Sequence, residues 1–163
     1  MMKIGVYYGS STGTTADVAQ RIANELGVAN GDVHDISSAN AADVGQYDLV
    51  VLGTSTWGMG ELQDDWVEFK DQLKPYLKGK KVALFGLGDS EGFGDTFCDG
   101  VGELYDEFEN AGCTFIGETS VEGYSYDSSK AERDGRLVGL LLDEMNQDDL
   151  TDERIAAWVA QLK

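Results

Sequence analysis

The sequence has a single histidine, His34, and only two cysteines, Cys98 and Cys113. One histidine is too few for a histidine-based metal cluster and leaves little from which to build a Ser/His catalytic triad, so both kinds of site are disfavoured. The two cysteines stand apart, outside the short spacings that mark zinc sites and redox pairs. We interpret them as small, partly buried thiols in a reducing compartment.

Long apolar segments are also missing from the chain. No apolar run approaches the roughly 20 residues that a membrane helix needs. The first four residues, Met-Met-Lys-Ile, lack the three-part pattern of a secretion signal. These absences predict a cytoplasmic protein with no membrane partner.

Basic residues are scarce, since 12 Lys and Arg stand against 30 Asp and Glu and give a formal net charge of -18. This charge argues against nucleic acid and anionic membranes as partners and favours basic protein surfaces. No basic residue lies between Lys81 and Lys130. Solvated helix faces are the alternative explanation for part of this acidic stretch. Its carboxylates are Asp89, Glu91, Asp95, Asp99, Glu103, Asp106, Glu107 and Glu109.

What the sequence does contain is a regular alternation of two apolar patterns. At 163 residues and 42% hydrophobic, the chain can form one globular domain with a core covered on both sides. The alternation predicts an α/β fold, a doubly wound five-stranded parallel sheet with helices on both faces. Short apolar runs predict buried strands at residues 3–8, 33–36, 48–53, 81–87 and 113–116. Helical spacing predicts helices at residues 15–26, 63–76, 96–111 and 151–162.

One segment interrupts this alternation. Residues 122–136 are polar and rich in turn-forming residues, and an apolar run resumes at residues 137–142. Because residues 114–116 alone are short for an edge strand, we predict a loop inserted into the last strand, with residues 137–142 supplying the remainder. The whole chain, residues 1–163, is expected to be a single domain.

The first predicted strand runs directly into a loop rich in glycine and hydroxyl groups, and a helix follows. Gly9 and Gly13 permit tight turns, and the start of the helix offers unpaired N–H groups and the positive end of its dipole. The pattern predicts a phosphate site, although a simple helix cap would need only one hydroxyl. No lysine follows Gly13, so the phosphate-loop motif of nucleotide hydrolases is absent. The hydroxyl side chains belong to Ser10, Ser11, Thr12, Thr14 and Thr15.

Two further glycine-rich loops follow the strands predicted at residues 48–53 and 81–87. Ligands of doubly wound sheets bind beyond the carboxyl ends of the strands, so all three loops should converge on one site. Trp57 and Phe93 are aromatic residues next to glycines in the second and third loops. A planar aromatic ligand could stack on them, and the alternative for Trp57 is an ordinary place in the core.

Four motifs, in this order, resemble the flavin-binding loops of the flavodoxin family. They are Gly-Ser-Ser-Thr-Gly-Thr-Thr at 9–15, Thr-Ser-Thr-Trp-Gly-Met-Gly-Glu at 54–61, Phe-Gly-Leu-Gly-Asp at 85–89 and Phe-Cys-Asp at 97–99. Residues 123–131 and 138–144 resemble the inserted loop and last strand of the long-chain subgroup, and residues 146–158 resemble its closing helix. The resemblance covers nearly the whole chain, and the motifs are specific as a set.

The resemblance implies a low-potential one-electron carrier that binds flavin mononucleotide (FMN) without a covalent bond and has no substrate chemistry of its own. It would act as a monomer that passes electrons from a flavodoxin reductase or similar donor to an acceptor oxidoreductase. The first loop would hold the phosphate, and two aromatic rings would enclose the isoalloxazine. The implied FMN-binding residues are Ser10, Ser11, Thr12, Gly13, Thr14, Thr15, Thr54, Ser55, Thr56, Trp57, Gly58, Met59, Gly60, Gly88, Asp89, Phe93, Phe97 and Cys98.

The chain departs from the family pattern at two positions. Phe93 stands where the family commonly has tyrosine, and Ser90 stands where many long-chain relatives have glutamine. Phenylalanine keeps the stacking area of the ring but lacks the hydroxyl. We therefore expect FMN binding to persist, with a modest change in affinity or reduction potential.

Other functions fit the sequence less well. The main alternative is a flavodoxin-like NAD(P)H:quinone reductase, in which a second substrate must stack on an open flavin face, usually in an oligomer. Aromatic residues for both faces argue against it, as does the shortage of basic residues to bind a nicotinamide cofactor. A regulatory module that only senses flavin stays open. A dinucleotide fingerprint, a cysteine phosphatase loop and a receiver-domain aspartate are all missing.

Overall fold

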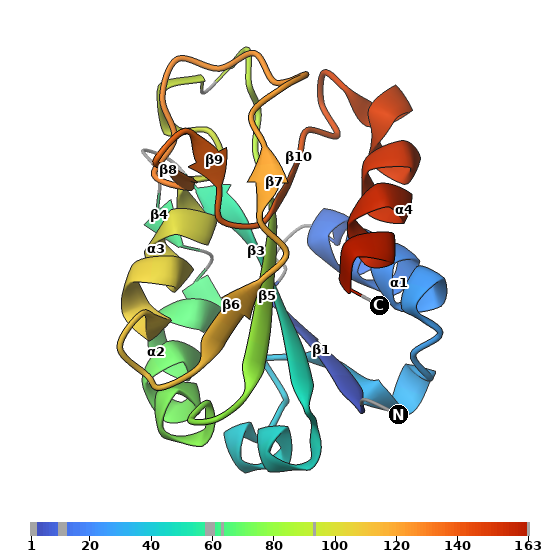
Figure 1. Cartoon of the computed structure of the whole chain (residues 1–163), viewed down its shortest axis with the longest axis vertical. Helices are drawn as coiled ribbons and strands as arrows, with labels where there is room; N and C mark the ends of the chain where they lie inside the picture. Colours follow the sequence, from blue (N-terminus) through green and yellow to red (C-terminus); the bar gives the residue numbers. More distant parts are fainter. Residues whose placement is uncertain (1–2, 10–12, 58–60, 63, 93, 163) are drawn as a thin grey trace.

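The computed structural model describes residues 3–9, 13–57, 61–62, 64–92 and 94–162. Strands and helices alternate along most of the chain (Figure 1). The strands of the main sheet are β1 (Ile4–Tyr8), β2 (Val33–Asp35), β3 (Leu49–Trp57), β4 (Glu61–Leu62), β5 (Lys81–Leu87), β6 (Thr114–Ile116) and β10 (Leu140–Leu142). The α-helices are α1 (Thr14–Leu26), α2 (Asp64–Leu73), α3 (Asp99–Phe108) and α4 (Thr151–Leu162). Short 3-10 turns are η1 (Asn30–Asp32), η2 (Ala41–Gln46), η3 (Lys74–Tyr76), η4 (Gly94–Thr96) and η5 (Asp148–Leu150).

The main sheet has the predicted doubly wound topology. Its strands follow the order β10-β5-β3-β1-β2, and β6 also pairs with β5. All of these pairs are parallel, and only the short β4 runs antiparallel, against β3. The predicted fold class is confirmed, since the chain forms an α/β structure with a mostly parallel sheet.

The last strand is divided between two segments that are far apart in the sequence. β6 pairs with Lys81–Ala83 and β10 with Phe85–Leu87, so together they occupy one edge of β5. Between them, β7 (Thr119–Ser120), β8 (Glu132–Arg133) and β9 (Arg136–Leu137) form a small antiparallel sheet. We call residues 117–139 the insert.

The strand predicted at residues 137–142 is wrong in its first part. Leu137 belongs to β9 of the insert, where it pairs with Thr119 and Glu132. The backbone N–H of Val138 bonds to Ala131 O at 2.9 Å, which also holds it to the insert. Only Leu140–Leu142 extends along β5, because the chain returns to the main sheet just before Leu140.

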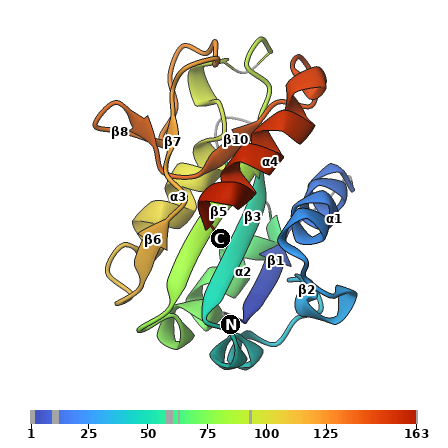
Figure 2. The same ribbon diagram turned by 45° about the vertical axis from the view of Figure 1, so that its right-hand side comes forward.

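Helices cover both faces of the main sheet (Figures 1 and 2). α1 and α4 lie together on one face, where their apolar residues pack with Leu49 and Val51 of β3. α2 and α3 lie on the other face and pack with Val50 and Leu52. Alternate residues of β3 therefore supply both halves of the core, as a strand buried on both faces requires.

Two predicted helices are shorter than their apolar patterns. The prediction for residues 63–76 becomes α2 followed by η3, which contains the single proline of the chain near its start. α3 begins at Asp99 and not at residue 96, because Cys98 has a φ of 51° in the left-handed region and interrupts the helical path. Within the described residues, no helix is both long and apolar enough to cross a membrane.

Candidate functional site

The carboxyl ends of β1, β3, β5 and β10 meet at one edge of the sheet. Tyr8 is in register with Gly53, and Gly53 with Phe85. Beyond the strands, Gly9 N donates to Gly53 O and Gly88 N donates to Leu142 O, both at 3.1 Å. The loops that follow these strands therefore start side by side, as the sequence predicts.

The N-terminus of α1 supplies one part of this edge. Gly13 is the N-cap residue, with a φ of 91°, and as a glycine it has no side chain of its own to cap the helix. In the first turn Thr14 is exposed and Thr15 is buried. The N-terminus of a 13-residue helix carries the positive end of the helix dipole and suits a bound anion. Of the predicted phosphate-binding residues, Ser10, Ser11 and Thr12 lie outside the described part of the chain.

The end of β3 supplies a second part, and β3 is longer than predicted. Thr54 is buried, and its Oγ1 donates to Ser55 O at 2.8 Å. Residues 54–57, expected in a loop after the strand, belong to β3: Thr54 and Ser55 pair with β5, and Thr56 and Trp57 pair with β4. The strand extends because β4 provides a backbone partner for this segment. Gly58, Met59 and Gly60, which connect the two strands, lie outside the described residues.

Ser55 carries a buried hydroxyl that has no hydrogen-bond partner within the described residues. A buried polar atom without a partner costs free energy, about 1–3 kcal/mol for a neutral group. Ser55 lies beside Leu87 in the register of β3 and β5, just before Gly88 begins the next loop. A polar group of a ligand at this edge of the sheet would satisfy the hydroxyl.

The loop after β5 is compact and closely packed. A Cβ on Gly88 would lie 2.7 Å from Cys98 N, so only glycine lets these two backbone segments approach so closely. Asp89 accepts from Gly92 N at 2.8 Å and from Glu91 N at 3.1 Å, which closes a tight turn. The Gly92 bond, with another from Asn146, holds the pKa of Asp89 below its usual value. Phe93 lies outside the described residues.

Phe97 and Cys98 have side chains that are completely buried in protein. The ring of Phe97 stacks on that of Tyr126 in the insert, with centroids 5.3 Å apart. Burial raises the pKa of the Cys98 thiol well above its usual value. Their predicted contact with a ligand therefore concerns backbone atoms, and it stays a prediction.

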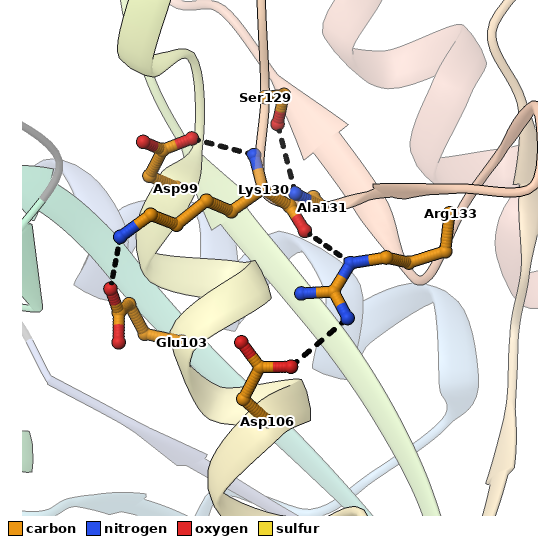
Figure 3. Close-up of polar contacts among 7 residues, drawn as sticks. All are labelled: Asp99, Glu103, Asp106, Ser129, Lys130, Ala131 and Arg133. Atoms are coloured by element: carbon orange, nitrogen blue, oxygen red, sulfur yellow. Dashed lines mark hydrogen bonds and ion pairs between the residues drawn. The ribbon is translucent and has the colours of Figure 1, made fainter.

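The insert is tied to α3 and to the segment that precedes it. Gly94 O accepts from the backbone N–H groups of Asp127 and Ser128 at 2.8 and 3.0 Å. Farther along, three contacts join the insert to α3 (Figure 3). They are Lys130 N to Asp99 Oδ1 at 2.7 Å, Lys130 Nζ to Glu103 Oε1 at 2.6 Å, and Arg133 to Asp106 Oδ1 at 3.0 Å.

Asp143 places a buried carboxylate at this edge that is not among the residues predicted from the sequence. It directly follows β10, and its side chain is completely buried. It accepts hydrogen bonds from the backbone N–H groups of Ser90, Met145 and Asn146, and also from the side chains of Ser90 and Asn146. Its position after an apolar strand of the parallel sheet was the only available signal.

These features suit a phosphorylated planar ligand. The start of α1 can accept an anion without a formal positive charge, and the unpartnered Ser55 hydroxyl and the glycine-lined loop after β5 can meet polar ligand atoms. No group of three or more His, Cys, Asp or Glu side chains in the described ranges is arranged to hold a metal ion.

Comparison with known proteins gives a consistent result. The family model described as Flavodoxin matches residues 6–158. The chain is 45% identical over 162 residues to a flavodoxin of Nostoc sp., covering 99% of this chain and 95% of the relative. It is 41% identical over 168 residues to flavodoxin 1 of Azotobacter vinelandii, covering 100% and 97%. The crystal structure of Fusobacterium nucleatum flavodoxin bound to flavin mononucleotide superposes with a TM-score of 0.90 at 32% identity, covering 99% of this chain and 97% of that chain.

Proposed function

The chain belongs to the flavodoxin family, and from this membership we propose that it binds FMN without a covalent bond and carries single electrons between redox proteins. One observation carries the proposal. The predicted FMN-binding loops begin at a single edge of the main sheet, and the chain superposes over nearly its full length on an FMN-bound flavodoxin. FMN would supply the redox chemistry, and the protein would bind it, orient it and tune it.

Each loop has a proposed role toward FMN. The N-terminus of α1 and residues 10–15 hold the phosphate, using neutral hydroxyl and N–H donors. Trp57 and Phe93 flank the isoalloxazine ring, while Ser55 and the backbone of residues 56–60, 88–89 and 97–98 meet its polar edge. The unpartnered hydroxyl of Ser55 and the close approach of Gly88 to Cys98 N support this arrangement.

We place the protein in the long-chain subgroup and regard it as a single domain. The division of the last strand into β6 and β10 around the insert supports the first point. A single main sheet that carries both halves of the core supports the second. The free thiols of Cys98 and Cys113 are in keeping with a cytoplasmic location.

The proposed partners are a reductase or similar donor and an acceptor oxidoreductase, each offering a basic surface to a monomeric carrier. The net charge of -18 supports this choice, because opposite charges steer the encounter of two proteins. Acidic residues also oppose the addition of electrons to a bound flavin, which favours a low reduction potential.

Two measurements test the function. The purified protein should show the visible absorption of a bound flavin, and the apoprotein should recover that spectrum when titrated with FMN. Mixing with NADPH in a stopped-flow instrument should reduce the flavin rapidly only when a flavodoxin reductase is present. Fast reduction by NADPH alone would instead support the quinone reductase alternative, and absence of FMN binding would refute both.

A further inference from the structure

We propose that Asp143 is a positioning residue that fixes the loop after β5, residues 88–92, in the geometry needed to receive the flavin. The inference rests on the proposed FMN function. Asp143 is not among the residues predicted to touch FMN. It would act through Ser90 and Asp89, which lie within that loop.

Asp143 contacts Ser90 of the loop directly. Asp143 Oδ2 accepts the backbone N–H of Ser90 at 3.0 Å, and it also accepts the Ser90 hydroxyl. One carboxylate oxygen thus holds both the main chain and the side chain of a single loop residue. Hydrogen bonds to a charged acceptor are the stronger kind, so this pair restrains the loop firmly.

Asp143 is itself held in place by the residues that follow it. Its Oδ1 accepts from the backbone N–H groups of Met145 and Asn146 at 3.1 and 2.9 Å. The side-chain amide of Asn146 donates both to Asp143 Oδ2, at 2.9 Å, and to Asp89 Oδ1, at 2.7 Å. Asp143 and Asn146 therefore hold the loop by hydrogen bonds to two successive residues, Ser90 and Asp89.

The segment that contains Asp143 is also linked to α1. Glu144, the next residue, pairs with Arg21 of α1 at 2.8 Å, and Arg21 also contacts Asp152 of α4. Residues 143–146 thus connect the loop after β5 with the helix whose N-terminus is the proposed phosphate site. A rigid connection would keep the two halves of the FMN site at a fixed spacing, and such preorganisation improves binding.

The experiment compares Asp143→Ala with Asp149→Asn, which removes an exposed carboxylate from the same region and serves as the matched control. Amide hydrogen exchange of the apoproteins is followed by NMR. We expect the Ser90 amide to exchange at least about tenfold faster in Asp143→Ala, since its acceptor is gone. The Gly88 amide, which bonds to Leu142 O, should keep its wild-type rate.

Equal acceleration at Ser90 and Gly88 would mean general destabilisation and would overturn the proposal, as would unchanged exchange at Ser90. If Asp143→Ala does not fold, Ser90→Ala replaces it. That variant removes only the hydroxyl donor and should speed Ser90 exchange by a smaller factor, with Gly88 again unaffected. No acceleration in Ser90→Ala would then count against the proposal.

The second measurement is titration of each folded apoprotein with FMN and with riboflavin. Because the loop is proposed to contact the ring system, Asp143→Ala should weaken the binding of FMN and of riboflavin by a similar factor, on the order of 10 to 100. It should also alter the visible circular dichroism of the bound flavin. Unchanged affinity and spectrum would refute the positioning role. If the wild-type protein bound neither flavin, the proposed function would fail, while the exchange data would still show whether Asp143 holds the loop.

Discussion

The carboxylate of Asp99 accepts the backbone N–H of Lys130 at 2.7 Å and so joins the start of α3 to the insert (Figure 3). Asp99 is only 4% exposed. Burial raises its pKa above the usual value, and the hydrogen bond and charge of Lys130 only partly offset that effect. The insert is therefore anchored by a carboxylate whose ionised form is costly in the folded protein.

Replacing Asp99 tests this anchor. Asp99→Ala leaves the Lys130 N–H without its carboxylate acceptor, and we expect a loss of about 1.5–3 kcal/mol in the free energy of unfolding. Asp99→Asn keeps an amide oxygen that can accept the same bond, so its loss should be smaller. Urea unfolding of the apoproteins measures both.

Asp106→Asn is the control, because it breaks only the exposed ion pair with Arg133, worth about 0–1 kcal/mol. If the Ala and Asn variants were equally stable, the hydrogen bond from the Lys130 N–H would not account for the stabilising effect of Asp99.

The pH dependence of the Asp99→Asn variant gives an independent check. A carboxyl group whose pKa is raised on folding stabilises the fold below its unfolded pKa, and this contribution is lost as pH rises through the folded pKa. The stability of Asp99→Asn relative to wild type should therefore improve as pH rises above about 4, and then level off. Urea titrations between pH 4 and 7 measure this difference. A difference that is constant, or that declines with rising pH, contradicts the raised pKa.

Asp143 should show the opposite pH dependence. Burial alone would raise its pKa, but the hydrogen bonds from Ser90 and Asn146 outweigh burial and hold the pKa below its usual value. Its stabilising contribution is then complete above the unfolded pKa and lost as pH falls through the folded one. We expect Asp143→Asn to lose about 1.5–3 kcal/mol at neutral pH, with the deficit shrinking below about pH 4. The comparison with Asp149→Asn cancels the general effect of removing one negative charge. If the stability deficit of Asp143→Asn grew as the pH fell, folding would raise the pKa of Asp143 and not lower it.

The hydroxyl-rich loop that is predicted to hold the phosphate should affect the binding of FMN but not that of riboflavin. Removing the hydroxyls of Thr12 and Thr15 together should weaken FMN binding between tenfold and several hundredfold, since a hydrogen bond contributes about 0.5–1.5 kcal/mol when both partners are neutral and about 1.5–3 kcal/mol when one is charged. Riboflavin has no phosphate and should bind almost as before. Fluorescence titration of the apoprotein measures both affinities. Thr15 is buried, so urea unfolding must first show that the variant is folded. Equal losses for the two ligands would exclude a phosphate role for these hydroxyls.

The order of strands and helices followed from the sequence because buried parallel strands and amphipathic helices have distinct apolar periods. Residues 81–87 illustrate this, since the predicted and observed strands coincide. The errors arose where tertiary contacts decide the backbone. β3 extends to Trp57 because β4 pairs with it, and Leu137 leaves the main sheet because it pairs with Thr119 in the insert.

The sequence also predicted which edge of the sheet carries the candidate site, but it did not predict Asp143. Glycine and hydroxyl residues at the ends of the predicted strands indicated that three loops meet at one edge of the sheet, and the structure does bring the carboxyl ends of β1, β3 and β5 together there, because the strands are parallel. Asp143 was missed because its partners, Ser90 and Asn146, lie on two different loops. A sequence pattern cannot bring residues 90 and 143 together without knowledge of the strand order.

The distribution of charge gives the last prediction, which concerns the rate of electron transfer. Three exposed acidic residues lie next to the candidate site: Glu91 in the loop after β5, Asp95 in η4 and Asp127 in the insert. Charges within about 8–10 Å of an approaching basic surface attract it, and salt screens them beyond that distance. Carboxylates beside the docking surface should raise the association rate with a basic reductase more than they raise the final affinity.

The variant Glu91→Gln/Asp95→Asn/Asp127→Asn should therefore react more slowly with a basic partner at low salt, and its rate should fall less steeply as salt is added. The matched control is Glu25→Gln/Asp43→Asn/Glu109→Gln, which removes the same charge from exposed residues at the C-termini of α1 and α3 and in η2. These segments precede strands of the main sheet and lie near its opposite edge, so the control should keep a salt dependence close to that of wild type. Stopped-flow reduction at several ionic strengths measures the slopes. If both variants lose the same fraction of the slope, net charge alone governs the encounter and the edge around the flavin site is not the docking surface.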